Sequence, residues 1–160
     1  SNLSPARLTE SFDVAEKNGL PKYVALQPHY NLVERAGFET DYAGLVEKYG
    51  LSVFPYWSLA AGFLTGKYRT EADFDKTARG GGIKKYFDAK GKAVLKALDA
   101  ISEKHETKQA TVALAWLLAK PLITAPIVSA TSERQLDTLC AAPALKLDTE
   151  DIELLNEVSN

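Results

Sequence analysis

The histidines and the single cysteine are the first residues in this sequence to weigh as chemical groups. His29 lies in "QPHYN" and His105 follows "AISEK". Histidine is the usual acid or base near neutral pH, so both invite a catalytic interpretation. The context of His105 favours a structural role, because a cation at a helix end interacts well with the helix dipole. Cys140 lies inside a helical apolar pattern, which predicts a small core residue.

The segment "VFPYWSLAAGFLTGKY", residues 53–68, is a second candidate. In it a short apolar run leads into Tyr56 and Trp57, then two glycines and Lys67. A strand-end tyrosine either packs in the core or rim or serves as a cofactor platform, and without further context packing is commoner. Gln27, after an earlier apolar run, could equally satisfy a neighbouring backbone group, and Lys67 could be a solvated side chain. These residues gain a role only from the elements that position them.

The composition sets the frame for those elements. A chain of 160 residues with 46% hydrophobic and 25% charged residues predicts one globular domain with a sizeable core. Its net charge of -2 and pI near 5.7 argue against nucleic-acid and polybasic membrane surfaces, so no nucleic acid or membrane partner is expected. The lone cysteine and the missing apolar leader predict a cytoplasmic setting. No Met occurs even at position 1, so we expect a piece of a longer protein.

Helical and strand patterns alternate along the chain. Ser4 as N-cap and Pro5 as first helical residue mark one helix, and Gly50 stops another. Ser132 and Gln135 have the spacing of a capping box. Three consecutive glycines, 80–82, predict a mobile or ligand-shaped segment. Helices are expected over residues 4–19, 40–49, 93–105, 109–120, 132–142 and from about 149 to 158; strands are expected over 23–27, 51–56 and 122–129.

Strands separated by helices imply a parallel sheet, since a helix is the compact way to cross over it. Three strands are too few to close a parallel barrel, which needs about eight. The chain is then either an open three-layer domain or part of a barrel whose other strands lie on sequence not present here.

Three stretches resemble the C-terminal half of the bacterial aldo-keto reductases. They are "LQPHYNLVER", "VFPYWSLAAGFLTGKY" and "ATVALAWLLAKPLITAPIVSATSERQL", and they occur in the family's order. The resemblance covers essentially all 160 residues. It implies an α/β fold, a (β/α)8 TIM barrel of which residues 1–160 form the C-terminal half of the single domain, about strands six to eight with their helices. Ser1-Asn2 would end strand five, and His29 would belong to the strand-six motif without being the family's catalytic histidine.

The resemblance also implies a cofactor site. Tyr56 ends its strand and would lie flat against a nicotinamide, while Ser1, Asn2 and Gln27 would hold the carboxamide of that ring. Residues 60–67 resemble the family's pyrophosphate strap, with Lys67 adding charge. The expected cofactor is NADP, as NADPH, with NAD as the alternative. The remaining cofactor-binding residues implied by the resemblance are Trp57, Ser58, Leu59, Gly62, Leu64, Gly66, Ser129, Thr131, Arg134 and Gln135.

The sequence departs from the family pattern at two places. Tyr56-Trp57-Ser58 stands where many members have Tyr-Ser-Pro, so an indole replaces a hydroxyl beside the cofactor. After strand eight, where many members have Lys or Arg to hold the 2′-phosphate of NADP, Arg134 is the only nearby cation. Leu139 occupies the place of a frequent adenine-contacting Asn. A terminal Ser-Asn pair is also typical of the remainder of a cleaved tag.

The family's catalytic Asp, Tyr, Lys and His come from strands two to four, so no catalytic residue is expected in this chain. The resemblance implies reduction of an aldehyde or ketone to an alcohol, with the missing N-terminal half of the barrel as a partner and self-association through open edges. The alternative is a regulatory or redox-sensing subunit of the same fold with little turnover. A stand-alone three-stranded interaction domain is a third reading.

Overall fold

The computed structural model describes residues 1–70, 72–73 and 80–160 of the chain. Within them two short strands, β1 (Ala25–Leu26) and β2 (Ser52–Val53), pair in parallel, with Ala25 opposite Ser52 and Leu26 opposite Val53. Backbone bonds extend this pairing in both directions, because the N–H groups of alternate residues donate to alternate carbonyls. The three bonds run from Ser52 to Val24 at 3.0 Å, from Phe54 to Leu26 at 2.9 Å and from Tyr56 to Pro28 at 2.9 Å.

A third segment runs beside β2 on its other side. Thr124 donates its N–H to the Val53 carbonyl and Ile127 to the Pro55 carbonyl, both at 2.9 Å. No strand is assigned there, so the strand predicted over 122–129 is not formed in regular geometry. Pro126 supplies the reason, since it has no N–H to continue the ladder. The parallel order of the three segments agrees with the prediction.

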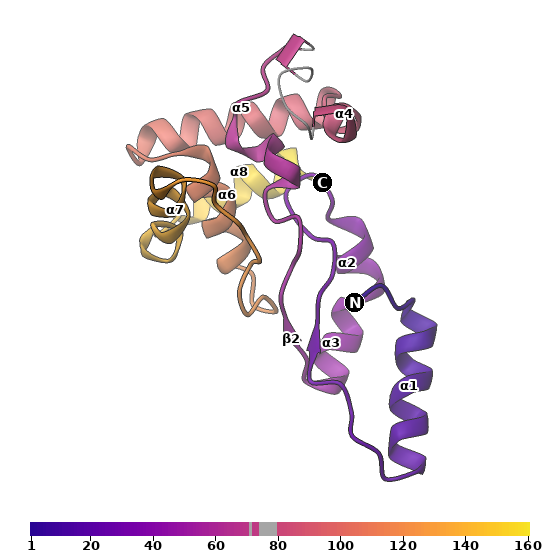
Figure 1. The fold of residues 1–160 in the computed structure, drawn as a ribbon. Helices are drawn as coiled ribbons and strands as arrows, with labels where there is room; N and C mark the ends of the chain where they lie inside the picture. Colours follow the sequence, from indigo (N-terminus) through magenta and orange to yellow (C-terminus); the bar gives the residue numbers. More distant parts are fainter. Residues whose placement is uncertain (71, 74–79) are drawn as a thin grey trace.

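The N-terminal helices lie along this small sheet (Figure 1). They are α1 (Pro5–Lys17), α2 (Ala36–Asp41) and α3 (Ala43–Tyr49). Helix α1 begins as predicted, with the Ser4 hydroxyl accepting from the Arg7 N–H at 3.3 Å. It packs on α3 through Phe12 and Tyr49, whose rings stack with centroids 3.9 Å apart.

The single helix predicted over 40–49 is wrong. Tyr42 separates α2 from α3 with φ near -117°, and its hydroxyl donates to the Leu3 carbonyl at 2.7 Å. This tertiary bond holds the break between the two helices, which the local sequence did not signal. Gly50 does end α3, in the left-handed conformation that glycine adopts without a steric penalty.

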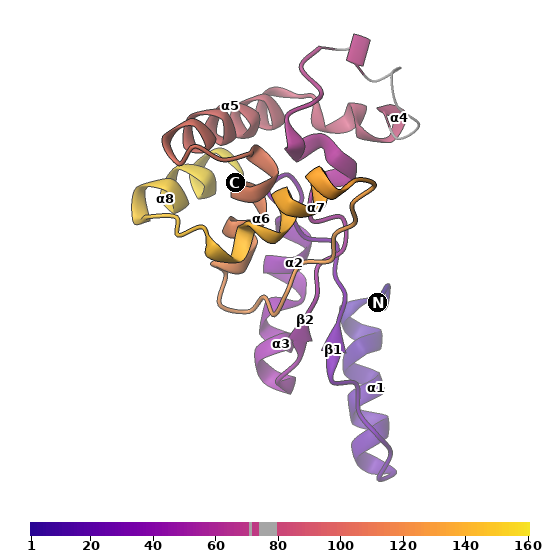
Figure 2. The same ribbon diagram turned by 60° about the vertical axis from the view of Figure 1, so that its left-hand side comes forward.

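The remaining helices gather at the other end of the molecule (Figure 2). They are α5 (Ala89–Lys104), α6 (Gln109–Leu118), α7 (Glu133–Cys140) and α8 (Thr149–Val158), with the short turns η1 (Ala60–Thr65), α4 (Gly80–Ile83), η3 (Lys84–Tyr86) and η4 (Ala142–Ala144). Residues 109–117 of α6 are all buried, as its uniformly apolar sequence predicts. Helix α5 packs against both α6 and α8.

Two sequence predictions fail in this part of the chain. The glycines 80–82 begin the short helix α4, because the buried side chains of Ile83 and Tyr86 anchor the segment that follows them. Cys140 is exposed rather than a core residue, since α7 lies at the edge of the helical layer and buries none of its side chains.

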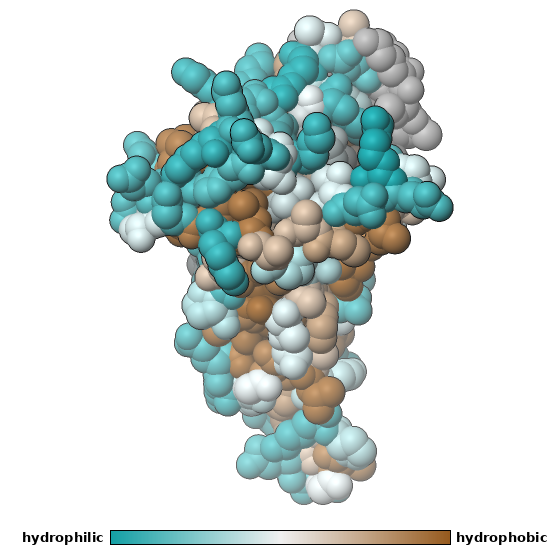
Figure 3. Space-filling view, turned by 90° about the vertical axis from the view of Figure 1, so that its left-hand side faces the viewer, coloured by the Kyte–Doolittle hydropathy of each residue, from teal (hydrophilic) through white to brown (hydrophobic). Residues whose placement is uncertain are grey.

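Apolar surface remains beside the strands. Figure 3 shows apolar residues gathered over the lower part of the molecule, below a mainly hydrophilic helical part. Val24, next to β1, is 78% exposed, and Tyr23 is also exposed. Such side chains on a strand beside a sheet edge are suited to a further packing partner.

Candidate functional site

Most residues predicted to bind a cofactor follow the carboxyl ends of the three parallel segments. Gln27 follows β1, Tyr56 follows β2, and Ser129 follows the segment 123–127. Because the segments are hydrogen-bonded in parallel, these ends share one edge, which is where ligands bind in parallel α/β sheets. We call residues 27–31, 56–67 and 127–135 the strand-end region.

The chain start lies against the first of these ends. The Ser1 hydroxyl donates to the backbone carbonyl of Gln27 at 3.0 Å, which joins two of the predicted residues. Asn2 has φ of 60°, a left-handed conformation that Asn tolerates better than most residues. The Gln27 side chain is exposed and has no hydrogen bond to a described residue, so its amide remains available to a ligand.

Two aromatic rings follow β2. Tyr56 is half-buried and Trp57 is 46% exposed. Trp57 has φ of 56°, which is unusual for a bulky residue and points to a constraint from its surroundings. The constraint is visible in the structure: the side chain of Asn31 donates to the Trp57 carbonyl at 2.9 Å.

Asn31 is fully buried and uses both ends of its amide. Its oxygen accepts from the N–H groups of Val33 at 2.9 Å and Glu34 at 3.1 Å, while its nitrogen holds Trp57. A buried amide that is satisfied on both sides fixes the segments it joins. Asn31 therefore ties the turn after β1 to the loop after β2.

Ser58 provides a second tie. It is buried, and its hydroxyl lies 3.0 Å from the Pro55 carbonyl and 3.1 Å from the Ile127 carbonyl, either of which can accept its proton. Leu64 is buried and Leu59 is packed against the core. At these three predicted positions the side chains serve packing, and Ser58 and Leu64 are buried as whole residues, so neither offers a surface to a ligand in this structure.

The loop after β2 has an unusual backbone. Ala60, Ala61 and Gly62 are consecutive left-handed residues with φ of 48°, 53° and 97°, and Gly66 has φ of 75°. Two of the N–H groups close the turn on itself: Ala60 donates to the Trp57 carbonyl at 2.7 Å and Gly62 to the Leu59 carbonyl at 2.9 Å. Cβ-branched or bulky residues would be strained there, which accounts for the small residues in this part of the sequence.

Lys67 folds back over this loop. A Cβ atom built on Gly62 would lie 3.1 Å from the Lys67 Nζ, so the ammonium group is next to the left-handed stretch, and it also lies 5.0 Å from the Tyr68 ring centroid. Gly66 faces the Gln109 side-chain amide, which occupies the space that a side chain at position 66 would need. The structure thus places the Lys67 ammonium group beside the loop of residues 60–62.

The residues after the third segment are exposed. Ser132 caps α7 through the Gln135 N–H at 3.3 Å, but the Gln135 side chain bonds Thr131 rather than closing the predicted box. Its oxygen accepts from the Thr131 N–H at 2.9 Å and lies 3.1 Å from the Thr131 hydroxyl. Ser129 is exposed, and the Arg134 guanidinium has no ion pair within the described part of the chain.

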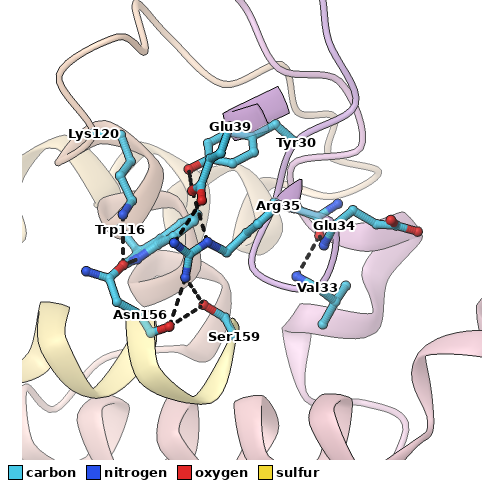
Figure 4. Close-up of polar contacts among 10 residues, drawn as sticks. Tyr30, Val33, Glu34, Arg35, Glu39, Trp116, Lys120, Asn156 and Ser159 are labelled. Carbon is cyan, nitrogen blue, oxygen red and sulfur yellow. Dashed lines mark hydrogen bonds and ion pairs between the residues drawn. The ribbon is translucent and has the colours of Figure 1, made fainter. Parts of the chain in front are cut away.

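A second polar cluster, the Arg35 network, lies between α2, α6 and α8 (Figure 4). Arg35 bonds both oxygens of Glu39 at 2.9 Å and donates to the Asn156 carbonyl and Ser159 hydroxyl at 2.8 Å. Tyr30 donates to Glu39 at 2.6 Å. The network also includes Trp116 and Lys120, which donate to the Asn156 side chain at 3.0 and 2.7 Å.

The charged groups of this network shift one another's pKa values. Burial lowers the pKa of Lys120, and the neighbouring Arg35 lowers it further. Burial would raise the pKa of Glu39, but the hydrogen bonds from Arg35 and Tyr30 outweigh it and the net shift is downward. Burial and the bond to Glu39 raise the pKa of Tyr30. Since these polar groups have partners within the protein, the network joins α2, α6 and α8.

Comparison with known proteins identifies the family. A model of the Aldo/keto reductase family matches residues 1–160. The chain belongs to this family. It is 30% identical over 158 residues to "Uncharacterized oxidoreductase YrpG" of Bacillus subtilis, covering 99% of this chain and 47% of that protein. It is 30% identical over 164 residues to "Protein tas" of Escherichia coli, covering 99% and 47%.

A third relative carries a different kind of name. "Probable voltage-gated potassium channel subunit beta" of Oryza sativa is 27% identical over 160 residues, covering 95% of this chain and 48% of that protein. The chain spans about half the length of the relatives it matches. Among the described residues, none of the helices combines the length and apolar character that a transmembrane span requires.

Sequence reasoning missed two parts of the site of this aldo/keto reductase chain. One is Asn31, whose burial and three bonds depend on the tertiary arrangement. The other is the left-handed backbone at Ala60 and Ala61, since alanine gives no signal for positive φ. The neighbouring Gly62 and Gly66 were the only sequence signal that this loop bends sharply.

Proposed function

We propose that the chain is the C-terminal half of a (β/α)8 aldo-keto reductase and carries its NADPH-binding residues, with NADH as the alternative cofactor. The full-length protein would reduce aldehydes or ketones to alcohols. The observation that carries the proposal is the strand-end region itself, where an exposed amide, two accessible rings and a left-handed loop beside a lysine share one edge. Family membership and relatives named as oxidoreductases support the same class of reaction.

The described residues fit such a cofactor. The exposed Gln27 amide can both donate to and accept from a carboxamide. The Tyr56 ring offers an accessible surface for a flat ring, and the exposed Lys67 beside the loop of residues 60–62 offers a cation to a pyrophosphate. Ser1, Asn2, Ser129, Thr131 and Gln135 lie along or beside the same edge. Arg134, exposed and without an ion pair among the described residues, is available to a 2′-phosphate.

Bound NADPH would supply a hydride to the carbonyl carbon of the substrate. The negative charge that builds on the carbonyl oxygen needs a proton donor and nearby positive charge. We propose that these groups lie on the half of the barrel outside this chain, and that the apolar surface beside β1 packs against that half or, without it, supports self-association. The chain alone should then have no carbonyl reductase activity. We assign the reduction by the full-length protein to the cytoplasm.

The first test is complementation. The 160-residue chain is assayed with NADPH and a reactive aldehyde, alone and after addition of the upstream half as a separate polypeptide. No turnover alone and turnover on addition is the expected result. Turnover by the chain alone would show that it contains its own proton donor and would overturn the half-enzyme proposal.

The second test concerns Tyr56. In the full-length protein Tyr56→Ala should weaken NADPH binding about fivefold, because a stacked ring contact is worth roughly 1 kcal/mol. Tyr56→Phe is the matched control, since it keeps the ring and removes only the hydroxyl, and should retain the wild-type affinity. Equal affinity of wild type and Tyr56→Ala in a fluorescence titration excludes the ring contact.

A regulatory subunit that binds the cofactor with little turnover is the second candidate. The relative named as a channel subunit beta supports it. Turnover of the full-length protein on simple aldehydes separates the two, since a regulatory subunit would bind NADPH with the same residues but reduce them very slowly.

A further inference from the structure

His29 lies in the strand-end region, and the family resemblance places it in the strand-six motif without giving it a role. It follows β1 and forms an isolated parallel bridge with Tyr56, which follows β2. The two rings stack, with centroids 5.3 Å apart and planes 13° from parallel. Trp57 meets the same imidazole edge-on, with centroids 5.4 Å apart and planes at 81°. His29 is thus the common neighbour of the Tyr56 and Trp57 rings.

The surroundings of His29 favour its neutral form. Burial lowers its pKa; Glu34 raises the pKa and Lys85 lowers it, and the net shift is downward. Glu34, in the turn after β1, and Lys85, in η3, form an ion pair of 2.6 Å that balances their charges. The Asn31 amide nitrogen lies 3.5 Å from the His29 Nε2.

We propose that His29 is a positioning residue, whose neutral imidazole backs the Tyr56 ring, and whose protonation selects against the oxidised form of the nicotinamide cofactor. This inference rests on the proposed function. It adds a residue and a pH-dependent preference to the site, whereas the proposed function concerns only which cofactor and reaction the site serves.

The positioning part follows from the geometry. A tyrosine side chain rotates about two bonds, and the His29 imidazole against one face of the Tyr56 ring restricts both rotations. Less conformational entropy is then lost when the other face of Tyr56 binds a ligand. Stacked aromatic pairs are favourable in offset arrangements at centroid distances of about 4.5–7 Å, which includes the separation found here. Without His29 the Tyr56 ring would lose this support on the side of β1.

The selective part follows from charge. The oxidised nicotinamide ring carries a positive charge that the reduced ring lacks. A protonated His29 would be separated from the nicotinamide by the Tyr56 ring and is partly shielded from solvent. Its positive charge would repel the oxidised ring through a medium of lower dielectric than water. The reduced form would not be affected in this way, so acidification should change the ratio of the two affinities.

The experiment uses the full-length protein with His29→Ala and His29→Phe, and His105→Gln as control for the only other histidine. Dissociation constants for NADP⁺ and NADPH are measured by titration from about pH 8 to about pH 5, the range in which histidines titrate. The 2′-phosphate, with a second pKa near 6, titrates in both cofactor forms, so the affinity ratio cancels its contribution. Tyr56 ring proton shifts are recorded without cofactor.

For the wild type and His105→Gln, we expect the affinity for NADP⁺ to fall relative to NADPH by about threefold to tenfold as the pH is lowered, equivalent to about 0.7–1.4 kcal/mol. His29→Phe should keep the affinities measured near pH 8 but lose the pH dependence of the ratio. His29→Ala should weaken both cofactors about fivefold and shift the Tyr56 ring protons.

Three results would overturn this inference while leaving the proposed function intact. They are unchanged affinities in His29→Ala, a Tyr56 ring signal that does not respond to it, and a ratio in His29→Phe that still varies with pH. Absence of any binding of either cofactor to the wild type would overturn both the proposed function and the role of His29. Loss of binding in His29→Phe as well as His29→Ala, with both variants folded, would show that ring support is not what His29 provides.

Discussion

The strand-end region and the Arg35 network are both rich in polar groups, but they use them differently. In the Arg35 network the guanidinium, the Glu39 carboxylate and the Lys120 ammonium all bond other protein groups. In the strand-end region the buried polar groups of Asn31 and Ser58 fix the backbone, while Gln27 and Arg134 stay without side-chain partners among the described residues. The first arrangement stabilises contacts between helices; the second leaves positioned groups for a ligand.

This difference can be tested, because substitutions in the two regions should affect different measurements. Changes in the Arg35 network should lower the free energy of unfolding. Changes to the exposed strand-end residues should lower affinity for the cofactor and leave unfolding almost unchanged. Asn31 links the two kinds of behaviour, since it is buried like the network but holds the loop of the site.

The largest effect is expected for Arg35→Met. It leaves Glu39 in a partly buried site without its cation and removes two bonds to α8, so we expect a loss of about 3 kcal/mol in the free energy of unfolding. Urea denaturation of the full-length protein measures it. Arg7→Met is the matched control, because the Arg7–Glu10 pair at 2.5 Å is largely exposed and should contribute less than about 1 kcal/mol. Similar losses of unfolding free energy in both variants would mean that the burial of the Arg35 network adds nothing to stability.

Asn31→Ala should cost about 2 kcal/mol, because the N–H groups of Val33 and Glu34 and the Trp57 carbonyl lose their partner. It should also speed hydrogen exchange of the Ala60 N–H, which donates to the Trp57 carbonyl at 2.7 Å. The exposed Asn18, whose amide donates to the Val14 carbonyl at 2.8 Å, gives the control Asn18→Ala. If exchange in the loop after β2 is unchanged in Asn31→Ala, the loop does not depend on this tie.

The sequence predicted elements whose signals are local. Ser4 and Pro5 located the start of α1, Gly50 located the end of α3, and the uniform apolarity of α6 predicted its burial. The apolar runs before Gln27 and Tyr56 located the strand ends, although regular pairing is limited to two residues in each strand. These features depend on caps and on residue patterns within a few positions of one another.

Features set by distant contacts were not predictable. The break at Tyr42 depends on a bond to Leu3, and the position of Trp57 depends on Asn31, 26 residues earlier. Cys140 fits a helical apolar pattern, yet whether α7 has a neighbour on that side depends on the packing of the whole layer. The pairing of His29 with Tyr56 likewise follows from the register of two segments, which a single sequence does not specify.

A smaller effect is expected from pH at the interface of α5 and α8. Burial would raise the pKa of Asp151, but hydrogen bonds from Lys104, His105 and the Asp148 N–H outweigh it and lower the pKa. A carboxyl with a lowered folded pKa stabilises the protein above its unfolded pKa, about 3.9, and the contribution is lost as the pH falls through the folded value. The stability advantage of wild type over Asp151→Asn should therefore be constant above about pH 5 and shrink below about pH 4, by at most about 1.4 kcal/mol per pH unit. Asp41→Asn, which removes an exposed carboxyl at the end of α2, is the control. If the difference in the free energy of unfolding between wild type and Asp151→Asn does not change on acidification, the ionised Asp151 is not its source.

The smallest effect is expected for Arg134, because its side chain is exposed and an exposed charge contributes little to binding. If the guanidinium meets the 2′-phosphate, Arg134→Ala should lower NADPH affinity by about twofold to fivefold, because an exposed charge pair is worth less than about 1 kcal/mol. NADH lacks that phosphate, so its affinity should hardly change, and unfolding should be unaffected since the side chain has no partner among the described residues. Lys146→Ala removes another exposed cation beyond α7 and controls for general charge attraction. Titrations at low and high salt sharpen the comparison, because screening should reduce the NADPH effect of Arg134→Ala. An equal fall for NADPH and NADH would mean that the phosphate is held elsewhere and that Arg134 contributes only to the general field of the site.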